Sequence, residues 1–411
     1  MLQPSILSRI PMRQIAKQIL LTVLLGAIVT FFAYHFPNLE KGTDFPAFYA
    51  AARMVFEGHG NELYDRAAQD RYLLRDSGRT GIYFFHPPFE ALIYLPFAVF
   101  PLPTAYALWC MVNAVLLIAV ARSLATTLAC PWDWWILVPL SLLFVPLLLN
   151  FFQGQDSLLL LCLLAVAVGA LQRNRSFAAG CLLGCGMFKF HLVLPMATVL
   201  LILARKRFLA GFLLVVTVLA LVSTAITGRT GLASYFVFLT QLTKMPLVGV
   251  HNQQMANLRG LFGTWLPAHH VVALTLVLVS SAAVLWAALQ GTARLADSSA
   301  AIRLASANAV LASLLVGYHL SPHDLTILLV PLAFLAQHIV ADNALRQPNK
   351  ILLAITVGTL FLPPLHLLLL AKHVYTYACF PLLLLFGLVL MEMRRISATQ
   401  VQEIARRAPA I

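Results

Sequence analysis

Charged residues are scarce in this chain. Only 10% of its 411 residues are charged, whereas 61% are hydrophobic and the mean hydropathy is +0.86. A soluble domain carries roughly 25% charged residues, so the composition excludes an ordinary soluble fold. Apolar runs of about 20 residues are long enough to cross a bilayer as helices. The sequence therefore predicts an all-α integral membrane protein.

Several catalytic and nucleotide-binding motifs are also missing. The sequence has no D-x-D pair, the usual carboxylate clamp for a divalent metal and a nucleotide diphosphate. It has no Walker P-loop, no H-E-x-x-H and no G-x-S-x-G. These absences argue against ATP binding, zinc protease chemistry and serine hydrolase chemistry. We therefore expect neither a metal site nor a cofactor.

The net charge of +13 is concentrated in short basic clusters. These clusters are Arg173 and Arg175, Arg205-Lys206-Arg207, Arg346 and Lys350, Arg394-Arg395 and Arg406-Arg407. Basic residues that gather in short loops mark the cytoplasmic side of a membrane protein. No groove of alternating basic and aromatic residues is evident, so nucleic acid is not an expected partner.

These clusters define an expected topology of about twelve transmembrane helices in a single domain, 1–411, with both termini in the cytoplasm. The first span is expected at Gln18–Phe36, followed by a large outer loop at 37–102 that contains short amphipathic helices. A second outer loop is expected at 228–269. The stretch between the clusters at 175 and 205 begins and ends inside, so it predicts a broken hairpin with its tip near Lys189.

Acidic residues gather in the first outer loop. Eight of the fifteen carboxylates fall between residues 40 and 90, and Asp44 follows the first span directly. A carboxylate at a membrane boundary, flanked by aromatic residues, suits a general base. The alternative is an N-cap for the helix that begins near Pro46. One residue can serve both purposes.

Further polar groups fall on the same expected outer side. His319, His323 and Asp324 join two spans, where ionisable groups are costly unless satisfied. Either imidazole could donate to a phosphate oxygen, and Asp324 could orient an imidazole or cap the following helix. Two residues near the start of another span, Gln155 and Asp156, could bind sugar hydroxyls or merely solvate a helix end.

Two more candidates are isolated in apolar sequence. Lys189 lies between two phenylalanines and needs an anionic partner, for which an incoming phosphate, Asp44 and Asp156 are the options. Snorkelling to the interface is the structural alternative. His86, before two prolines, is a weaker candidate of the same kind.

Taken together, these motifs resemble the family-87 glycosyltransferases of the GT-C superfamily. The resemblance rests on Thr43-Asp44-Phe45, Leu63-Tyr64-Asp65, His86-Pro87-Pro88, Gly154-Gln155-Asp156, Lys189 and His323-Asp324. It covers nearly the whole chain. It departs from the family pattern at Asp156, where Asn is usual, and at His86, where Tyr is usual.

The resemblance implies a function and a set of site residues. Members are similar to polyprenol-phosphate-mannose-dependent mannosyltransferases, multispanning enzymes with an extracytoplasmic active site. It implies Asp44 as catalytic base, His323 and then His319 near the donor phosphate, and Lys189 in the broken hairpin. Gln155, Asp156, Asp324 and His86 complete the expected substrate-binding set.

The expected reaction moves a sugar, mannose by this resemblance, from a polyprenyl phosphate to an extracytoplasmic lipid or glycan acceptor in a bacterial inner membrane. Because a lipid phosphate is a good leaving group, one carboxylate base and phosphate-binding donors suffice, without a metal. A single base predicts inversion at the anomeric carbon. The alternatives are a lipid-linked sugar flippase or transporter, and a non-catalytic partner in cell-envelope assembly.

Overall fold

The computed structural model describes residues 43–128, 134–242, 251–295, 298–342, 345 and 347–407. Within these ranges every regular element is helical, in agreement with the all-α prediction. The expected first span, Gln18–Phe36, lies outside the described residues.

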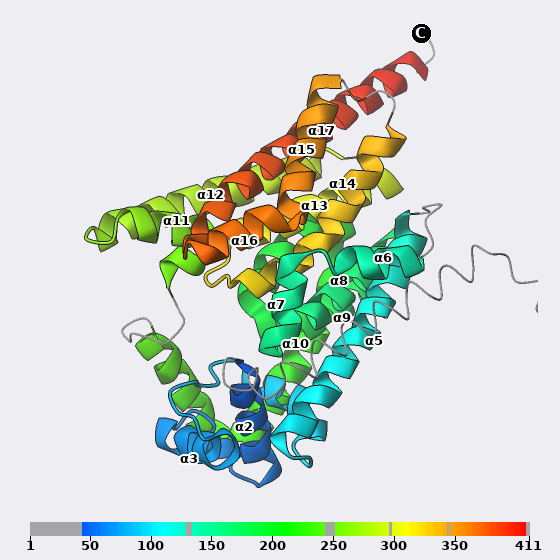
Figure 1. Cartoon of the computed structure of the whole chain (residues 1–411). Helices are drawn as coiled ribbons and strands as arrows, with labels where there is room; N and C mark the ends of the chain where they lie inside the picture. The colour runs from blue at the N-terminus through cyan, green and yellow to red at the C-terminus, as the bar shows by residue number, and fades with distance from the viewer. Residues whose placement is uncertain are drawn as a thin grey trace, which may run out of the picture.

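The described part of the first outer loop is built from short helices. They are α2 (Phe45–Phe56), η2 (Gly60–Glu62), α3 (Arg66–Ser77), η3 (Pro88–Glu90), α4 (Ala91–Tyr94) and η4 (Leu95–Phe97). Buried aromatic side chains hold them together, with Phe48 stacked on Tyr94 at 4.7 Å between ring centroids and Tyr94 4.6 Å from Trp109. Figure 1 shows α2 and α3 at the end of the molecule opposite the C-terminus.

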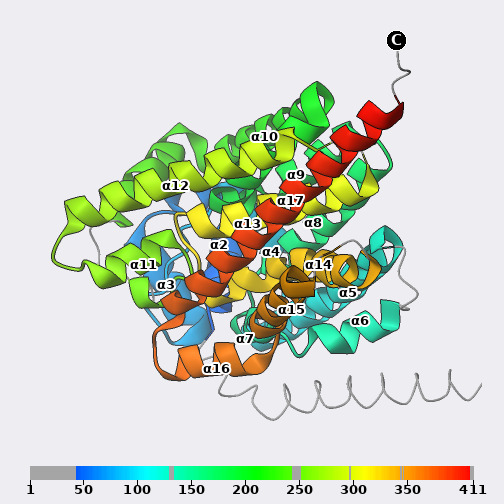
Figure 2. The same cartoon turned by 90° about the horizontal axis from the view of Figure 1, so that it is seen from above.

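The remaining helices form the body of the protein. They are α5 (Leu102–Leu128), α6 (Trp134–Ser141), α7 (Val145–Gln153), α8 (Ser157–Gln172), α9 (Ser176–Cys185), η5 (Gly186–Lys189), α10 (Phe190–Leu242), η6 (Asn252–Gln254), α11 (Leu258–Trp265), α12 (His270–Ala293), α13 (Ser299–Val316), η7 (Pro322–Leu328), α14 (Leu329–Ala341), α15 (Gln347–Phe361), α16 (Pro363–Ala371), η8 (Tyr375–Ala378) and α17 (Cys379–Arg407). Helix α13 is central and packs against α10, α12, α14 and α17 (Figure 2). Its many alanines and serines allow this close approach of helix backbones.

The expected count of about twelve spans is not confirmed. In the described residues, six helices are long and apolar enough to cross a membrane. The count rises to eight if each of two bent pairs, α6 with α7 (76°) and α15 with α16 (52°), is one span. One of the six, Ser176–Thr240, has 65 residues. A straight helix of this many residues would be about three times as long as the roughly 30 Å hydrocarbon core of a bilayer is thick. Its backbone leaves helical geometry at Arg205 and Gly228.

The stretch between the basic clusters at 175 and 205 forms a broken hairpin. The 3₁₀ turn η5 interrupts it at Gly186–Lys189, and the chain turns again at Arg205. Ser176 lines the same cavity of about 670 Å³ as Leu201 and Arg205, so the two ends of the hairpin meet. Lys189 lies at its tip.

The second outer loop at 228–269 contains more helix than we expected. Residues 229–242 continue α10 beyond the kink at Gly228, and Leu258–Trp265 forms α11. Tyr235 in this part of α10 packs on Tyr64 of the first outer loop, with ring centroids 4.7 Å apart. The two expected outer segments therefore pack together.

Candidate active site

Asp44 occupies the N-cap position of α2, but its carboxylate does not cap the helix. No side-chain hydrogen bond to the start of α2 is present. Instead, Oδ2 accepts a hydrogen bond of 2.8 Å from Nε2 of Gln155, and the backbone N–H of Asp44 donates to the carbonyl of Gln153. The side chain is half-buried. A partly accessible carboxylate bound to a neutral amide remains able to accept a proton.

The loop between α7 and α8 brings these partners to Asp44. Helix α7 ends at Gln153 and is capped by Gly154, which has φ +65°, a conformation that glycine adopts without strain. A Cβ atom at this position would lie 2.6 Å from Cβ of Phe45. Glycine therefore allows the loop to touch the start of α2, and the flanking Gln153 and Gln155 both reach Asp44.

His323 reaches the same loop from the other side. Its Nδ1 lies 2.6 Å from Oε1 of Gln153. If that amide oxygen accepts, Nδ1 carries the proton and the neutral ring has its lone pair on Nε2. Nε2 lies 3.6 Å from Oδ1 of Asp324. Asp44 and the 319–324 corner, distant in sequence, thus converge on Gln153.

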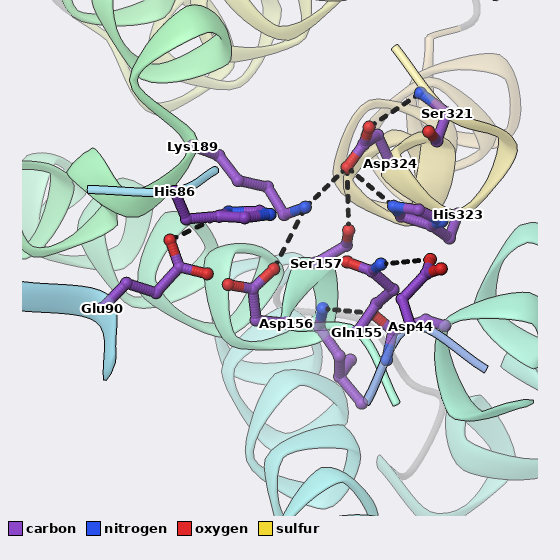
Figure 3. A network of polar contacts seen from close by, with 12 residues as sticks. Asp44, His86, Glu90, Gln155, Asp156, Ser157, Lys189, Ser321, His323 and Asp324 are labelled. Atoms are coloured by element: carbon purple, nitrogen blue, oxygen red, sulfur yellow. Dashed lines mark hydrogen bonds and ion pairs between the residues drawn. The ribbon is translucent and has the colours of Figure 1, made fainter. Parts of the chain in front are cut away.

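Lys189 is held between two buried carboxylates. Its Nζ lies 2.8 Å from Oδ1 of Asp324 and 3.0 Å from Oδ1 of Asp156 (Figure 3). Ser157 also donates to Oδ1 of Asp324, and the backbone N–H of Ser321 donates to Oδ2. All three charged side chains are at most 3% exposed. Of the partners considered from sequence, Asp156 is the one observed, and Asp324 is an additional one.

These contacts argue against Lys189 as a direct ligand of the donor phosphate. An ammonium already neutralised by two carboxylates has no net charge left for a phosphate. Burying an ion costs several kcal/mol unless it is paired and hydrogen-bonded, so the three charges hold one another in place. The same contacts orient Asp324 toward His323.

Glu90, which sequence reasoning missed, lies beside His86. The carboxyl group is fully buried, and its Oε2 is 3.0 Å from Nδ1 of His86, without the alignment of a good hydrogen bond (Figure 3). Burial raises the pKa of Glu90 well above its usual value, and the charge of Asp156 raises it further. Burial also lowers the pKa of His86 to about 3. At pH 7 the imidazole of His86 is therefore neutral, and the raised pKa of Glu90 favours its protonated form. Its one sequence signal is the spacing of four residues, about one helical turn.

His319 lies at the edge of the cluster. Its Nε2 is 3.1 Å from the hydroxyl of Ser321, and its ring lies 6.4 Å from Phe85 and 6.2 Å from His191 between centroids. Burial lowers the pKa of His319 to about 4. It therefore faces the site as a neutral imidazole.

All eight residues selected from sequence belong to one region. Asp44, Gln155, Asp156, Lys189, His323 and Asp324 form a linked polar network, with His319 and His86 at its margins. They come from five parts of the chain: the residue before α2, the segment before η3, the α7–α8 loop, the tip of the hairpin and the 319–324 corner. Two cavities, of about 360 and 670 Å³, lie elsewhere.

A separate group of potential metal ligands lies between α14 and α17. Among the described residues, His338, Asp342 and Glu392 are the group whose ligand atoms lie within 4.8 Å of one another. Arg395 contacts both carboxylates, with Nε 2.8 Å from Glu392. The guanidinium of Arg395 would compete with a metal cation for these carboxylates, so we interpret the group as an ion-pair network.

The helical membrane architecture and the buried polar cluster define the class as a polytopic membrane protein with an enzyme-like site. The family model of glycosyltransferase family 87 matches residues 84–317, more than half of the chain. The chain therefore belongs to glycosyltransferase family 87 and is a membrane glycosyltransferase. No curated protein and no solved structure matches it. The matched range includes His86, Gln155, Asp156 and Lys189, while Asp44 and the 319–324 corner lie outside it.

Proposed function

We propose that this protein transfers a sugar from a polyprenyl phosphate to an acceptor on the extracytoplasmic side of a bacterial inner membrane, with inversion and without a metal. We propose mannose as the sugar because Asp44, Gly154-Gln155-Asp156 and His323-Asp324 resemble the motifs of polyprenol-phosphate-mannose-dependent mannosyltransferases. The observation that carries the proposal is the meeting of Asp44 and His323 on Gln153. This contact joins a base to a group able to donate to a phosphate.

Asp44 is the proposed base because the other acids of the cluster are occupied. Asp156 and Asp324 both contact Lys189, and Glu90 is fully buried with a raised pKa. Asp44 is half-buried and hydrogen-bonds a neutral amide. It would remove the proton from the acceptor hydroxyl as that oxygen attacks the anomeric carbon. With one available carboxylate, attack opposite the leaving phosphate inverts that carbon.

His323 is the proposed donor to the departing phosphate. With Nδ1 directed at Gln153, Nε2 is the nitrogen left for the substrate. A proton taken up at Nε2 when the donor phosphate binds would let His323 donate a hydrogen bond to the developing phosphate charge, and Asp324 would stabilise the imidazolium formed in that step. Lys189 and Asp156 then act by positioning Asp324. Gln155 orients Asp44 and is the proposed contact for a sugar hydroxyl.

The experiment is incubation of the purified protein with individual polyprenyl-phosphate sugars and cell-envelope lipids, followed by mass spectrometry. The proposal expects a product heavier than one acceptor by one sugar residue (a sugar less one water), together with free polyprenyl phosphate. Donor movement across vesicle membranes without any product would instead indicate a flippase.

A further inference from the structure

The proposed donor carries a negative phosphate, but before the donor binds the one ammonium of the cluster, that of Lys189, is already paired with two carboxylates. Asp156 and Asp324 outweigh Lys189 by one charge, and His86 and His319 are neutral at pH 7. A phosphate placed in this cluster would meet net negative charge. Productive binding therefore needs a cation from outside the Lys189 network.

Arg259 supplies a cation at the edge of the cluster. It is the second residue of α11, and its Nη1 donates a 2.8 Å hydrogen bond to the carbonyl of Tyr318, the residue before His319. Its charge is close enough to contribute to the lowered pKa of His319, after the larger effect of burial. Arg259 thus faces the corner that carries both histidines.

The structure fixes this arginine without neutralising it. Its guanidinium carbon lies 4.0 Å from the centroid of the Tyr318 ring, and Asn257 anchors the start of α11 by donating to the carbonyl of Gly317 at 2.7 Å. No carboxylate forms an ion pair with Arg259 within the described part of the chain. The side chain is half-buried. A stacked guanidinium with free N–H groups suits two-point binding of a phosphate.

We propose that Arg259 binds the phosphate of the lipid-linked sugar donor. This inference rests on the proposed function, because it assigns a residue to that donor. It places the phosphate between Arg259 and the 319–324 corner, within reach of His323. Lys189, buried between two acids, keeps its positioning role.

The test compares Arg259→Gln and Arg259→Lys with Arg229→Gln, an exposed arginine in α10 that has no part in the cluster. Steady-state transfer is measured with the donor varied at saturating acceptor, then with the acceptor varied at saturating donor. Inhibition by sugar-free polyprenyl phosphate and by inorganic phosphate is measured in parallel. Thermal melting checks that each variant is folded.

For Arg259→Gln we expect a rise in donor KM of roughly tenfold to a hundredfold, the range for a lost charge-assisted hydrogen bond. Inhibition by polyprenyl phosphate should weaken similarly, with acceptor KM and melting nearly unchanged. Arg259→Lys keeps the charge and should fall between parent and Gln variant, which preserves the test if the Gln variant does not fold. Arg229→Gln should match the parent.

An unchanged donor KM, an effect confined to acceptor KM, or equal effects in Arg259→Gln and Arg229→Gln would overturn the assignment. Selective loss of inhibition by inorganic phosphate alone would show a general anion site and would also overturn it. A parent protein that makes no product from any polyprenyl-phosphate sugar refutes the proposed function itself, which separates the two failures.

Discussion

Replacing Lys189 with methionine is the perturbation that best separates a positioning role from direct phosphate binding. Methionine has a similar length but no charge, so Asp156 and Asp324 would remain buried without their shared partner. The two contacts, at 3.0 and 2.8 Å, belong to side chains that are at most 3% exposed. Breaking one buried ion pair typically costs about 3–5 kcal/mol.

That cost is large beside the total stability of a folded domain, about 5–15 kcal/mol. We expect Lys189→Met to lower the melting temperature strongly in detergent or to prevent accumulation of folded protein. Adding Asp156→Asn and Asp324→Asn removes both unpaired charges, so the triple variant should recover most of the lost stability. The assay is thermal unfolding of the three purified proteins, with size-exclusion profiles.

Two results would contradict the positioning role of Lys189. If Lys189→Met melted with the parent and only its donor KM rose, Lys189 would be a phosphate contact and the positioning account would be wrong. Failure of the two Asn substitutions to restore stability would show that repulsion between unpaired carboxylates is not the cause of the loss.

Three further variants test other parts of the site. Burial favours the protonated form of Glu90 in the folded protein, whereas the unfolded chain ionises above about pH 4.5, so stability is lost as pH rises from that value toward the raised pKa. Glu90→Gln should therefore flatten the fall in melting temperature above about pH 4.5, and equal slopes would contradict this. Gly154→Ala should cost about 1–3 kcal/mol in an unfolding measurement because of its positive φ and the close Phe45, whereas Gly358→Ala, with nothing within 4 Å, should not destabilise. His323→Ala should reduce kcat for transfer about a hundredfold, while the exposed His269→Ala should leave it unchanged; equal rates would remove His323 from catalysis.

The sequence sufficed to predict the helical membrane class and the convergence of polar groups. Run length and low charge identify membrane helices without any tertiary information. The side on which a loop falls follows from basic clusters, so Asp44, Gln155 and His323 could be placed on one face. Their contacts through Gln153 are consistent with that placement.

The partners within the site could not be predicted in this way. Lys189 and Asp324 are 135 residues apart, and no local spacing relates them. Glu90 lies in a short apolar stretch whose buried side becomes apparent only when α4 packs on α2. No sequence feature distinguishes Arg259 from other arginines, whereas the structure shows its guanidinium stacked on the ring of Tyr318. The expected count of about twelve spans is not confirmed, because charge clusters give only the parity of crossings, whereas bends such as the 76° angle between α6 and α7 interrupt individual helices.

The central claim is that the Asp44 carboxylate accepts the proton of the acceptor hydroxyl. Its most direct test is the rate of sugar transfer by purified Asp44→Asn, measured by mass spectrometry under conditions where the parent is active. Asparagine keeps the size of the side chain and can still hydrogen-bond Gln155 but cannot act as the base. The account predicts a folded protein that binds the donor and forms no detectable product, and transfer at the parental rate would contradict it.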